Sequence, residues 1–264
     1  MSKVRIDTLL VEKKHFETRQ KAQSAILEGI VYIDEVRIDK SGEMVSEDCN
    51  IIIRGEKLPF VSRGGIKLDK AIKVFAINVK DYICMDIGAS TGGFTDCLLQ
   101  NQAKFVYAID VGYGQLAWKL RSDKRVKSLE KTNFRYLDYD IIGEQVDFFC
   151  TDVSFISLEK ILPKAYEFLK ENGTGVCLIK PQFEASKEEV GKKGVIKDKE
   201  IHIKVIIKII DFCKKNNFKI IGLNYSPIKG PEGNIEFLLY VSKNEKFNEE
   251  YDIDKIVEEA HCQL

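Results

Sequence analysis

The sequence has little proline, no tract of glycine or serine, and no long apolar run. Its 264 residues contain 5 Pro, which excludes a low-complexity linker protein. No apolar stretch approaches the roughly 18 residues that a membrane span requires. The longest one, 201–213, is interrupted by charged residues and predicts an amphipathic helix. The first ten residues lack the continuous apolar core of a signal peptide. We therefore expect a cytoplasmic protein with no membrane association.

Metal-binding and disulfide patterns are also missing. The seven cysteines are odd in number and widely spaced, no CxxC pair occurs, and the three histidines lie far apart. Cys84, Cys150 and Cys177 fall within apolar, strand-like runs, where a free cysteine behaves as a small buried hydrophobe. We expect no metal site and no disulfide framework, in keeping with a reducing compartment.

The chain has no net charge, because 41 Lys and Arg balance 41 Asp and Glu. Taken whole, this is not the charge of a protein that coats DNA or RNA. The balance is uneven, however: residues 160–219 hold 14 basic and 8 acidic residues, and residues 245–264 hold 2 and 7. The basic stretch is open to two interpretations, a functional surface or a solvated face. The acidic stretch predicts a solvated terminal helix.

What is present is enough apolar and aromatic sequence for two domains, with 44% hydrophobic residues. Residues 1–53 predict a small α+β domain, in which Thr18 caps the second helix and Gly29 ends it. Residues 54–60 predict a linker, and residues 61–264 a larger domain. The strands expected in the small domain are 30–33, 36–38 and 50–53.

The larger domain alternates strands with helices, which predicts an α/β fold with a parallel sheet. Residues 61–68 lead into a helix, and four strands follow, at 83–87, 105–109, 146–151 and 175–179. Two last strands, 218–225 and 235–241, are joined by a connection too short for a crossover helix. The last strand must therefore run antiparallel. We expect the Rossmann-like sheet of a class I methyltransferase from this order.

A glycine-rich turn after the first of these strands predicts a cofactor site. The turn lets the backbone approach a ligand, and Asp110 ends the next strand, where it can accept hydrogen bonds from ribose hydroxyls. Neither GxGxxG nor GxxxxGK[ST] occurs, which argues against a nicotinamide cofactor and against a nucleotide hydrolase. Acidic groups suit the cationic S-adenosylmethionine. The candidate cofactor-binding residues are Asp86, Gly88, Ala89, Ser90, Thr91, Gly92, Gly93, Asp110 and Asp152.

Charged residues follow two parallel strands and precede the antiparallel one. Asp152 and Lys180 follow strands, and Glu236 begins the last strand, so all three meet at the ligand-binding edge of the sheet. The alternative is that Lys180 and Glu236 are ordinary charges at the ends of surface strands. Thr151–Phe155 lacks the Asn/Asp-Pro-Pro-aromatic motif of enzymes that methylate exocyclic amines. A lysine suits a hydroxyl acceptor, because it stabilises a developing alkoxide.

The motifs VSRGGIKL, DIGASTGGFTD, DVGYGQLAWKLR, DVSFISL and LIKPQFE resemble the TlyA family of rRNA cytidine 2′-O-methyltransferases, also called haemolysins. The resemblance covers essentially the whole chain. It implies an FtsJ-type methyltransferase that uses S-adenosylmethionine, preceded by a domain similar to the RNA-binding module of ribosomal small-subunit protein four. It also implies a catalytic tetrad, whose members in this sequence are Lys67, Asp152, Lys180 and Glu236.

Roles for these residues follow from the resemblance. Lys180 would polarise the ribose hydroxyl, Asp152 and Glu236 would orient the lysines, and Lys67 would position the acceptor. The expected partners are ribosomal RNA and ribosomal subunits, not DNA. The candidate RNA-binding residues lie on the first two helices and are Arg5, Lys13, Lys14, Arg19 and Lys21.

Two other functions remain open from the sequence. One is a pore-forming haemolysin, as the older family label suggests, and the other is an RNA-binding scaffold without catalysis. Methyl transfer to ribosomal RNA would favour the enzyme, and lysis of liposomes would favour the pore. The sequence names neither the modified nucleotide nor the ribosomal subunit.

Overall fold

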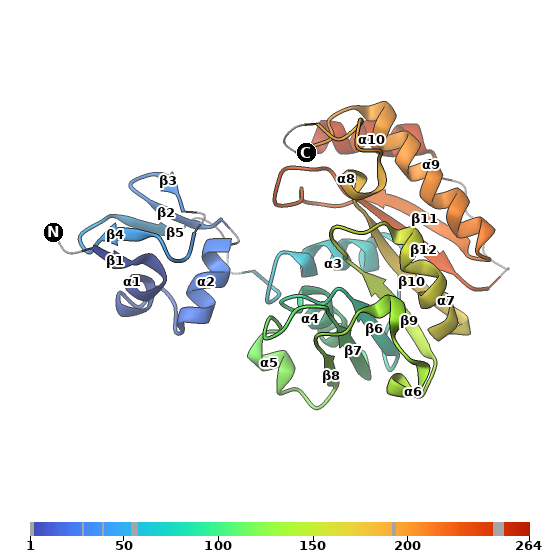
Figure 1. Ribbon diagram of the computed structural model, residues 1–264, viewed down its shortest axis with the longest axis horizontal. Helices are drawn as coiled ribbons and strands as arrows, with labels where there is room; N and C mark the ends of the chain where they lie inside the picture. The colour runs from blue at the N-terminus through green and yellow to red at the C-terminus, as the bar shows by residue number, and fades with distance from the viewer. Residues whose placement is uncertain (1–2, 28, 39, 54–57, 192–193, 245–250) are drawn as a thin grey trace. The chain divides into compact units, whose positions relative to one another are not determined.

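The computed structural model describes residues 3–27, 29–38, 40–53, 58–191, 194–244 and 251–264. The chain forms two compact units, Met1–Arg63 and Gly64–Leu264, and each is described by itself (Figure 1). The division falls three residues beyond the expected start of the larger domain at residue 61. Residues 54–57 of the expected linker lie outside the described residues.

The N-terminal unit packs two helices against short strands. Helix α1 (Ile6–Glu12) contacts α2 (Arg19–Leu27), and β2 (Val31–Ile33) pairs with β3 (Val36–Arg37) and β5 (Ile51–Ile53). A second pair, β1 (Lys3–Arg5) with β4 (Met44–Ser46), was not expected from the sequence. A small apolar core includes Ile6, Leu10 and Ile26.

The predicted helix ends in this unit agree with the structure. The Thr18 hydroxyl accepts a hydrogen bond from the Lys21 backbone amide at 3.2 Å, which is the geometry of an N-terminal cap. Gly29 has a φ of 72°, in the left-handed region that glycine adopts without strain.

The second unit contains a seven-stranded sheet in the order β11-β12-β10-β9-β6-β7-β8. Every strand is parallel to the others except β12, which runs antiparallel between β11 and β10. This confirms the predicted class I methyltransferase topology. The strands are β6 (Ile83–Ile87), β7 (Phe105–Ile109), β8 (Val126–Leu129), β9 (Val146–Thr151), β10 (Leu169–Ile179), β11 (Lys219–Tyr225) and β12 (Phe237–Ser242).

Two strands differ from the sequence-based expectation. Strand β8 was not predicted, because four residues at the edge of a sheet give too short a pattern. Strand β10 begins six residues early and has an irregular register between Leu169 and Thr174, where Gly173 interrupts the apolar pattern.

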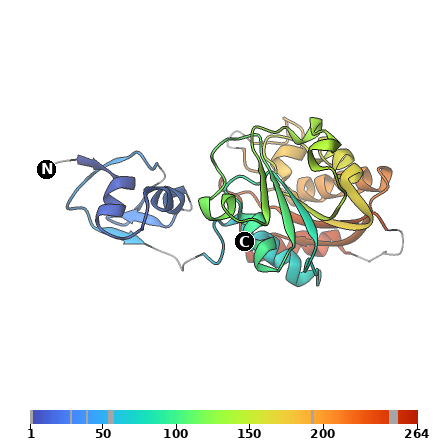
Figure 2. The same cartoon turned by 90° about the horizontal axis from the view of Figure 1, so that it is seen from below.

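Helices cover both faces of the sheet, as Figure 2 shows. Helices α7 and α9 pack onto one face over a core that includes Met85, Phe149 and Phe237. Helices α3 and α4 contact each other on the opposite face. The helices of this unit are α3 (Gly64–Val74), α4 (Gly93–Gln100), α5 (Trp118–Arg121), α6 (Tyr139–Ile142), α7 (Leu162–Phe168), α8 (Pro181–Glu184), α9 (Lys199–Lys215) and α10 (Ile253–Gln263), with the 3-10 helices η1 (Phe134–Tyr136) and η2 (Leu158–Lys160).

The start of α3 differs from the pattern in the sequence. The helix begins at Gly64, so Lys67 lies within its first turn rather than in the segment leading to it. Leu68, Ala71 and Ile72 form the buried stripe of this helix. The seven cysteines are free thiols. Within the described ranges, no helix is long and apolar enough to cross a membrane.

Candidate active site

Four charged side chains form a continuous chain of ion pairs at one edge of the sheet. The Lys180 ammonium lies 2.5 Å from Asp152 Oδ1, and Lys67 Nζ lies 3.7 Å from Asp152 Oδ2. Lys67 Nζ also lies 2.6 Å from Glu236 Oε2. The order is therefore Lys180, Asp152, Lys67 and Glu236, and the structure brings together all four residues of the expected tetrad.

The sheet topology explains this convergence. Asp152 follows β9 and Lys180 follows β10, so both lie at the carboxyl edge of parallel strands. Because β12 is antiparallel to β10, Phe237 pairs with Ile179, and Glu236, which directly precedes β12, lies at the same edge. Lys67 comes from the first turn of α3, which contacts β12. The antiparallel strand is therefore what places Glu236 beside the other three residues.

Burial makes these charges depend on one another. Burial opposes ionisation of Asp152, but the nearby ammonium groups of Lys67 and Lys180 outweigh it and hold the pKa of Asp152 below its usual value. Burial raises the pKa of Glu236, and Lys67 offsets only part of this rise. Two cations and two carboxylates cancel in sum, which makes their burial tolerable.

Two residues beside Asp152 were not expected from the sequence. Lys180 Nζ donates to Ser154 Oγ at 3.0 Å, which gives the ammonium a second fixed partner. Phe155 is 91% exposed, has a left-handed φ of 62°, and its ring centroid lies 5.1 Å from that of Phe183. Such a backbone conformation is costly for a non-glycine residue and concentrates at functional sites. A sequence alone gives no signal for it.

The strand that leads into the candidate cofactor turn, β6, contains a buried carboxylate with one oxygen that has no partner among the described residues. Asp86 Oδ2 accepts hydrogen bonds from the Thr95 amide at 2.9 Å and from the Thr95 hydroxyl at 2.7 Å. Asp86 Oδ1 is buried and has no hydrogen-bond partner among the described residues. Burial raises the pKa of Asp86 to about 7. A cationic ligand would satisfy this oxygen, so the turn fits the ammonium group of S-adenosylmethionine.

The glycines of this turn are required by close contacts. At Gly88, with a φ of 85°, a Cβ would lie 2.8 Å from the Asp152 carbonyl oxygen. At Gly92, with a φ of 95°, it would lie 2.3 Å from Leu120 Cδ1. The Asp152 amide also donates to the Ile87 carbonyl at 3.1 Å. The cofactor turn and the tetrad are thus in direct backbone contact.

Asp110 stabilises the turn through hydrogen bonds from two main-chain amides. Its carboxylate accepts hydrogen bonds from the Ser90 amide at 2.8 Å and from the Gly112 amide at 2.6 Å. The residue remains partly exposed, which leaves acceptor capacity on its two oxygens. Ala89 and Thr91 lie in the turn between β6 and α4, and Gly93 is the first residue of α4.

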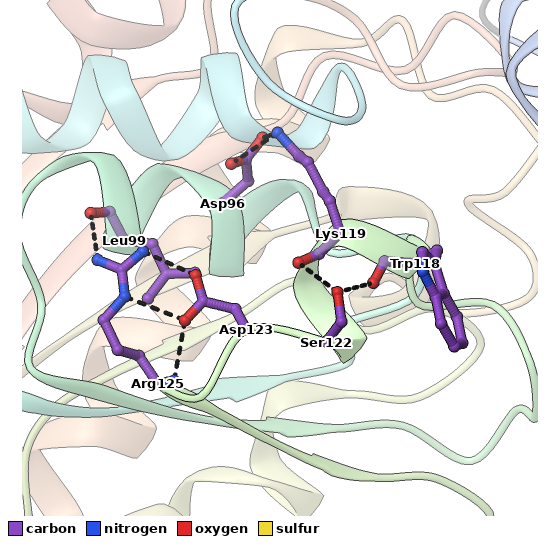
Figure 3. A network of polar contacts seen from close by, with 7 residues as sticks. All are labelled: Asp96, Leu99, Trp118, Lys119, Ser122, Asp123 and Arg125. Carbon is purple, nitrogen blue, oxygen red and sulfur yellow. Dashed lines mark hydrogen bonds and ion pairs between the residues drawn. The ribbon is translucent and has the colours of Figure 1, made fainter. Parts of the chain in front are cut away.

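The segment around α5 contacts α4, the helix that follows this turn (Figure 3). Lys119 Nζ lies 2.9 Å from Asp96 Oδ2 on α4, and the Arg125 guanidinium binds both Asp123 and the Leu99 carbonyl. Trp118 is largely exposed, and only its main-chain oxygen accepts a bond in this network, from the Ser122 hydroxyl. One salt bridge, from Lys119 to Asp96, and one hydrogen bond, from Arg125 to the Leu99 carbonyl, therefore join the α5 segment to α4.

The N-terminal unit has its own charge cluster, centred on buried Asp7. Its carboxylate accepts hydrogen bonds from Arg5 at 3.0 and 3.1 Å, from Arg19 at 2.9 Å and from Gln23 at 2.8 Å. The Arg5 guanidinium, burial notwithstanding, holds the pKa of Asp7 well below its usual value. Asp7 was missed in the sequence because its partners lie on two separate elements, Arg5 on β1 and Arg19 and Gln23 on α2.

The other three candidate RNA-binding residues lie outside this cluster. Lys21 forms an ion pair with Glu17, one helical turn away. Lys13 and Lys14 are exposed at the end of α1. The structure thus brings Arg5 and Arg19 together and leaves Lys13, Lys14 and Lys21 as separate exposed cations.

This sheet and its tetrad define a class I methyltransferase of the FtsJ-like kind. Residues 60–243 match the FtsJ-like methyltransferase family, and residues 4–48 match the S4 domain. The chain therefore belongs to the family of FtsJ-like methyltransferases with an N-terminal S4 domain that includes TlyA, as the resemblance implied.

Several relatives match most of the chain. It is 50% identical to YqxC of Bacillus subtilis, described as a candidate rRNA methyltransferase, over 99% of this chain and 95% of the relative. It is 40% identical to the 16S/23S rRNA (cytidine-2′-O)-methyltransferase TlyA of Mycobacterium tuberculosis, over 90% of both chains. Hemolysin A of Brachyspira hyodysenteriae is 41% identical, over 90% of this chain and 99% of the relative.

A solved structure supports the same conclusion for the whole chain. A candidate hemolysin from Streptococcus thermophilus matches with a TM-score of 0.79 and 45% identity, covering 100% of this chain and 97% of the other.

Proposed function

We propose that this chain transfers a methyl group from S-adenosylmethionine to the ribose 2′-hydroxyl of a cytidine in ribosomal RNA. The observation that carries the proposal is the buried chain of ion pairs from Lys180 to Glu236 beside the cofactor turn. The name of the Mycobacterium tuberculosis relative, a 16S/23S rRNA (cytidine-2′-O)-methyltransferase, supports the substrate class.

The cofactor would be held by the turn after β6. Asp86 Oδ1 would accept from its ammonium group, and Asp110 from its ribose hydroxyls. Gly88, Ala89, Ser90, Thr91, Gly92 and Gly93 would bring the backbone within reach of it. When bound, S-adenosylmethionine supplies an electrophilic methyl group.

The tetrad would prepare the acceptor oxygen. Lys180 Nζ, fixed by Asp152 and Ser154, would stabilise the negative charge that develops on the 2′-oxygen as its proton leaves to water. Lys67 would position the acceptor, with its ammonium group held by Glu236 and Asp152. Orientation of two bound reactants accounts for up to about 7–11 kcal/mol of a barrier in well-aligned cases.

The RNA would contact exposed groups on both units. On the N-terminal unit we assign phosphate contacts to Arg5, Lys13, Lys14, Arg19 and Lys21. Near the tetrad, exposed Phe155 presents an aromatic face on which a base can stack. Such contacts suit an unpaired nucleotide, because bases inside a helix are already stacked.

The test is transfer of labelled methyl groups from S-adenosylmethionine to purified ribosomal RNA and subunits, followed by mapping of the modified nucleotide. Lys180→Ala should abolish transfer while the cofactor still binds with near-normal affinity by calorimetry. Lys170→Ala, which removes a lysine paired with Asp147 away from the tetrad, is the matched control and should remain active. Full activity of Lys180→Ala would overturn the assignment. Lysis of liposomes without methyl transfer would favour the haemolysin instead.

A further inference from the structure

One buried side chain joins the loop that leads to Glu236 with the segment between α8 and α9. Asn234 lies in the loop between β11 and β12, and it is almost completely buried. Its Oδ1 accepts a hydrogen bond from the Ile196 amide at 2.9 Å, and its Nδ2 donates to the Gly194 carbonyl at 2.9 Å. Gly194 and Ile196 belong to the segment between α8 and α9, which continues the chain from Lys180. Asn234 therefore ties the Glu236 loop to the segment that follows Lys180.

The same loop folds its backbone against the Glu236 carboxylate. The Gly230 amide donates to the Asn234 carbonyl at 2.9 Å, and the Gly233 amide donates to the Gly230 carbonyl at 2.9 Å. A Cβ on Gly230 would lie 2.6 Å from Glu236 Oε1 and 3.3 Å from its Cδ. Only glycine at this position leaves room for the carboxylate.

Packing and one ion pair hold Glu236 in place. Its Oε2 lies 2.6 Å from Lys67 Nζ, whereas its Oε1 is buried without a hydrogen bond among the described residues. The side that carries Oε1 faces Gly230. The position of the carboxylate thus depends on Lys67 on one side and on the loop backbone on the other.

We propose that Asn234 and Gly230 are positioning residues for the Lys67–Glu236 pair of this methyltransferase. Asn234 fixes the loop relative to the segment after Lys180, and Gly230 forms the wall against which the carboxylate of Glu236 rests. The inference rests on the proposed function, since it concerns the rate of that reaction. It assigns a role to two residues that belong neither to the tetrad nor to the cofactor turn.

Each substitution disturbs the pair in a different way. In Gly230→Ala, the added methyl group displaces the Glu236 carboxylate from Lys67, because the loop is held by Asn234. In Asn234→Ala, the buried Ile196 amide loses its acceptor, and the loop is free to shift. Both changes leave the cofactor turn and the RNA-binding cations intact.

The experiment compares the full chain with four variants in methyl transfer to ribosomal RNA. The test variants are Gly230→Ala and Asn234→Ala. The first control is Gly191→Ala, where a Cβ would meet none of the described residues at less than 3.5 Å. The second is Asn216→Ala, which removes an asparagine that also donates to a main-chain carbonyl at 2.9 Å, at the end of α9. For each protein, kcat, KM for RNA, the cofactor Kd and Tm are measured.

We expect kcat to fall about tenfold or more in both test variants, with KM and the cofactor Kd within about twofold of the unmodified chain. The controls should keep their kcat. Unchanged kcat in Gly230→Ala would overturn the inference, and so would a loss of kcat matched by a loss of cofactor binding or of folded protein. If the unmodified chain itself transfers no methyl group, the proposed function fails instead.

Discussion

The two units each contain a carboxylate that binds two cations, and the two clusters differ in exposure. In the N-terminal unit Asp7 holds Arg5 and Arg19, whose side chains are 45% and 54% exposed. In the second unit Asp152 holds Lys67 and Lys180, whose side chains are 7% and 10% exposed. Charges exposed to water interact weakly and are screened by salt, whereas desolvated charges act strongly on a bound group. The first arrangement suits reversible contact with phosphates, and the second suits chemistry.

The largest expected effect comes from removing the carboxylate of the buried cluster. In Asp152→Asn the two ammonium groups of Lys67 and Lys180 lose their shared counter-charge, and we expect methyl transfer to fall by about a thousandfold. The free energy of unfolding should also fall, by about 3–5 kcal/mol, because the two buried lysines lose the negative charge of Asp152. Single-turnover transfer and urea unfolding measure these effects.

Asp147→Asn is the control, since Asp147 also accepts from a lysine but lies away from the tetrad. If Asp147→Asn and Asp152→Asn lost equal activity, the buried position of the Asp152 cluster would not explain the effect on methyl transfer.

Asp86 sharpens the comparison, because it is a buried carboxylate without a bound cation. Its pKa is raised to about 7, so the folded protein without ligand is most stable with Asp86 protonated. The stability that protonated Asp86 contributes to the folded protein is lost as the pH rises from about 4, the pKa of an exposed carboxyl group, to about 7. A cationic cofactor prefers the ionised form. Its affinity should therefore fall about tenfold between pH 8 and pH 6.

Calorimetry of S-adenosylmethionine binding across this pH range measures the effect, with Asp86→Asn as the reference. The Asn variant should bind more weakly, and its affinity should change less with pH. An identical pH dependence in both proteins would assign the titration to another group. Thermal unfolding of the ligand-free proteins at pH 8 should show the Asn variant to be the more stable.

Asp7→Asn makes the corresponding change in the N-terminal cluster, in which the two arginines are exposed. Arg5 and Arg19 lose a charged acceptor and become free to move, so we expect RNA affinity to fall several-fold while kcat at saturating RNA stays unchanged. Filter binding and steady-state rates separate the two quantities. A loss of kcat comparable to that of Asp152→Asn would mean that the two clusters do not divide binding and chemistry as their exposure suggests.

The smallest expected effect concerns salt. If Arg19 contacts one phosphate, Arg19→Ala should lower the slope of log K against log salt by about one and weaken binding to all RNA sequences alike. Glu17→Ala, which frees Lys21, should change the slope little or increase it. An unchanged slope in Arg19→Ala would remove this arginine from the RNA interface.

Much of the second unit could be predicted because its signals are local. Two predicted strands are followed directly by Asp152 and Lys180. The connection before Glu236 is too short for a helix, so the last strand had to be antiparallel. These features were enough to place the three charges at one edge of the sheet. The partner of each lysine was not predictable, since it depends on side-chain positions around the first turn of α3. Asn234 was equally hidden, because its bonds reach 38 and 40 residues back along the chain.

The N-terminal unit was harder to predict. Its strands β1 and β4 have three residues each and pair across about forty residues of sequence, so neither shows a clear alternating pattern. Asp7 lies in the first turn of α1, where an acidic residue is common. Only the fold shows that the cations at positions 5 and 19 share it.

The place of β12 in the sheet also determines the order in which the site can be completed during synthesis. This strand lies between β10 and β11, although it follows both in sequence. While a ribosome is still making residues before 237, the growing chain has β9, β10 and the cofactor turn but lacks the strand that joins β11 to the sheet. Glu236 arrives with that strand. In a nascent chain, Glu236 therefore joins the other three charged residues only when β12 enters the sheet. Completion of this cluster thus comes at the end of folding.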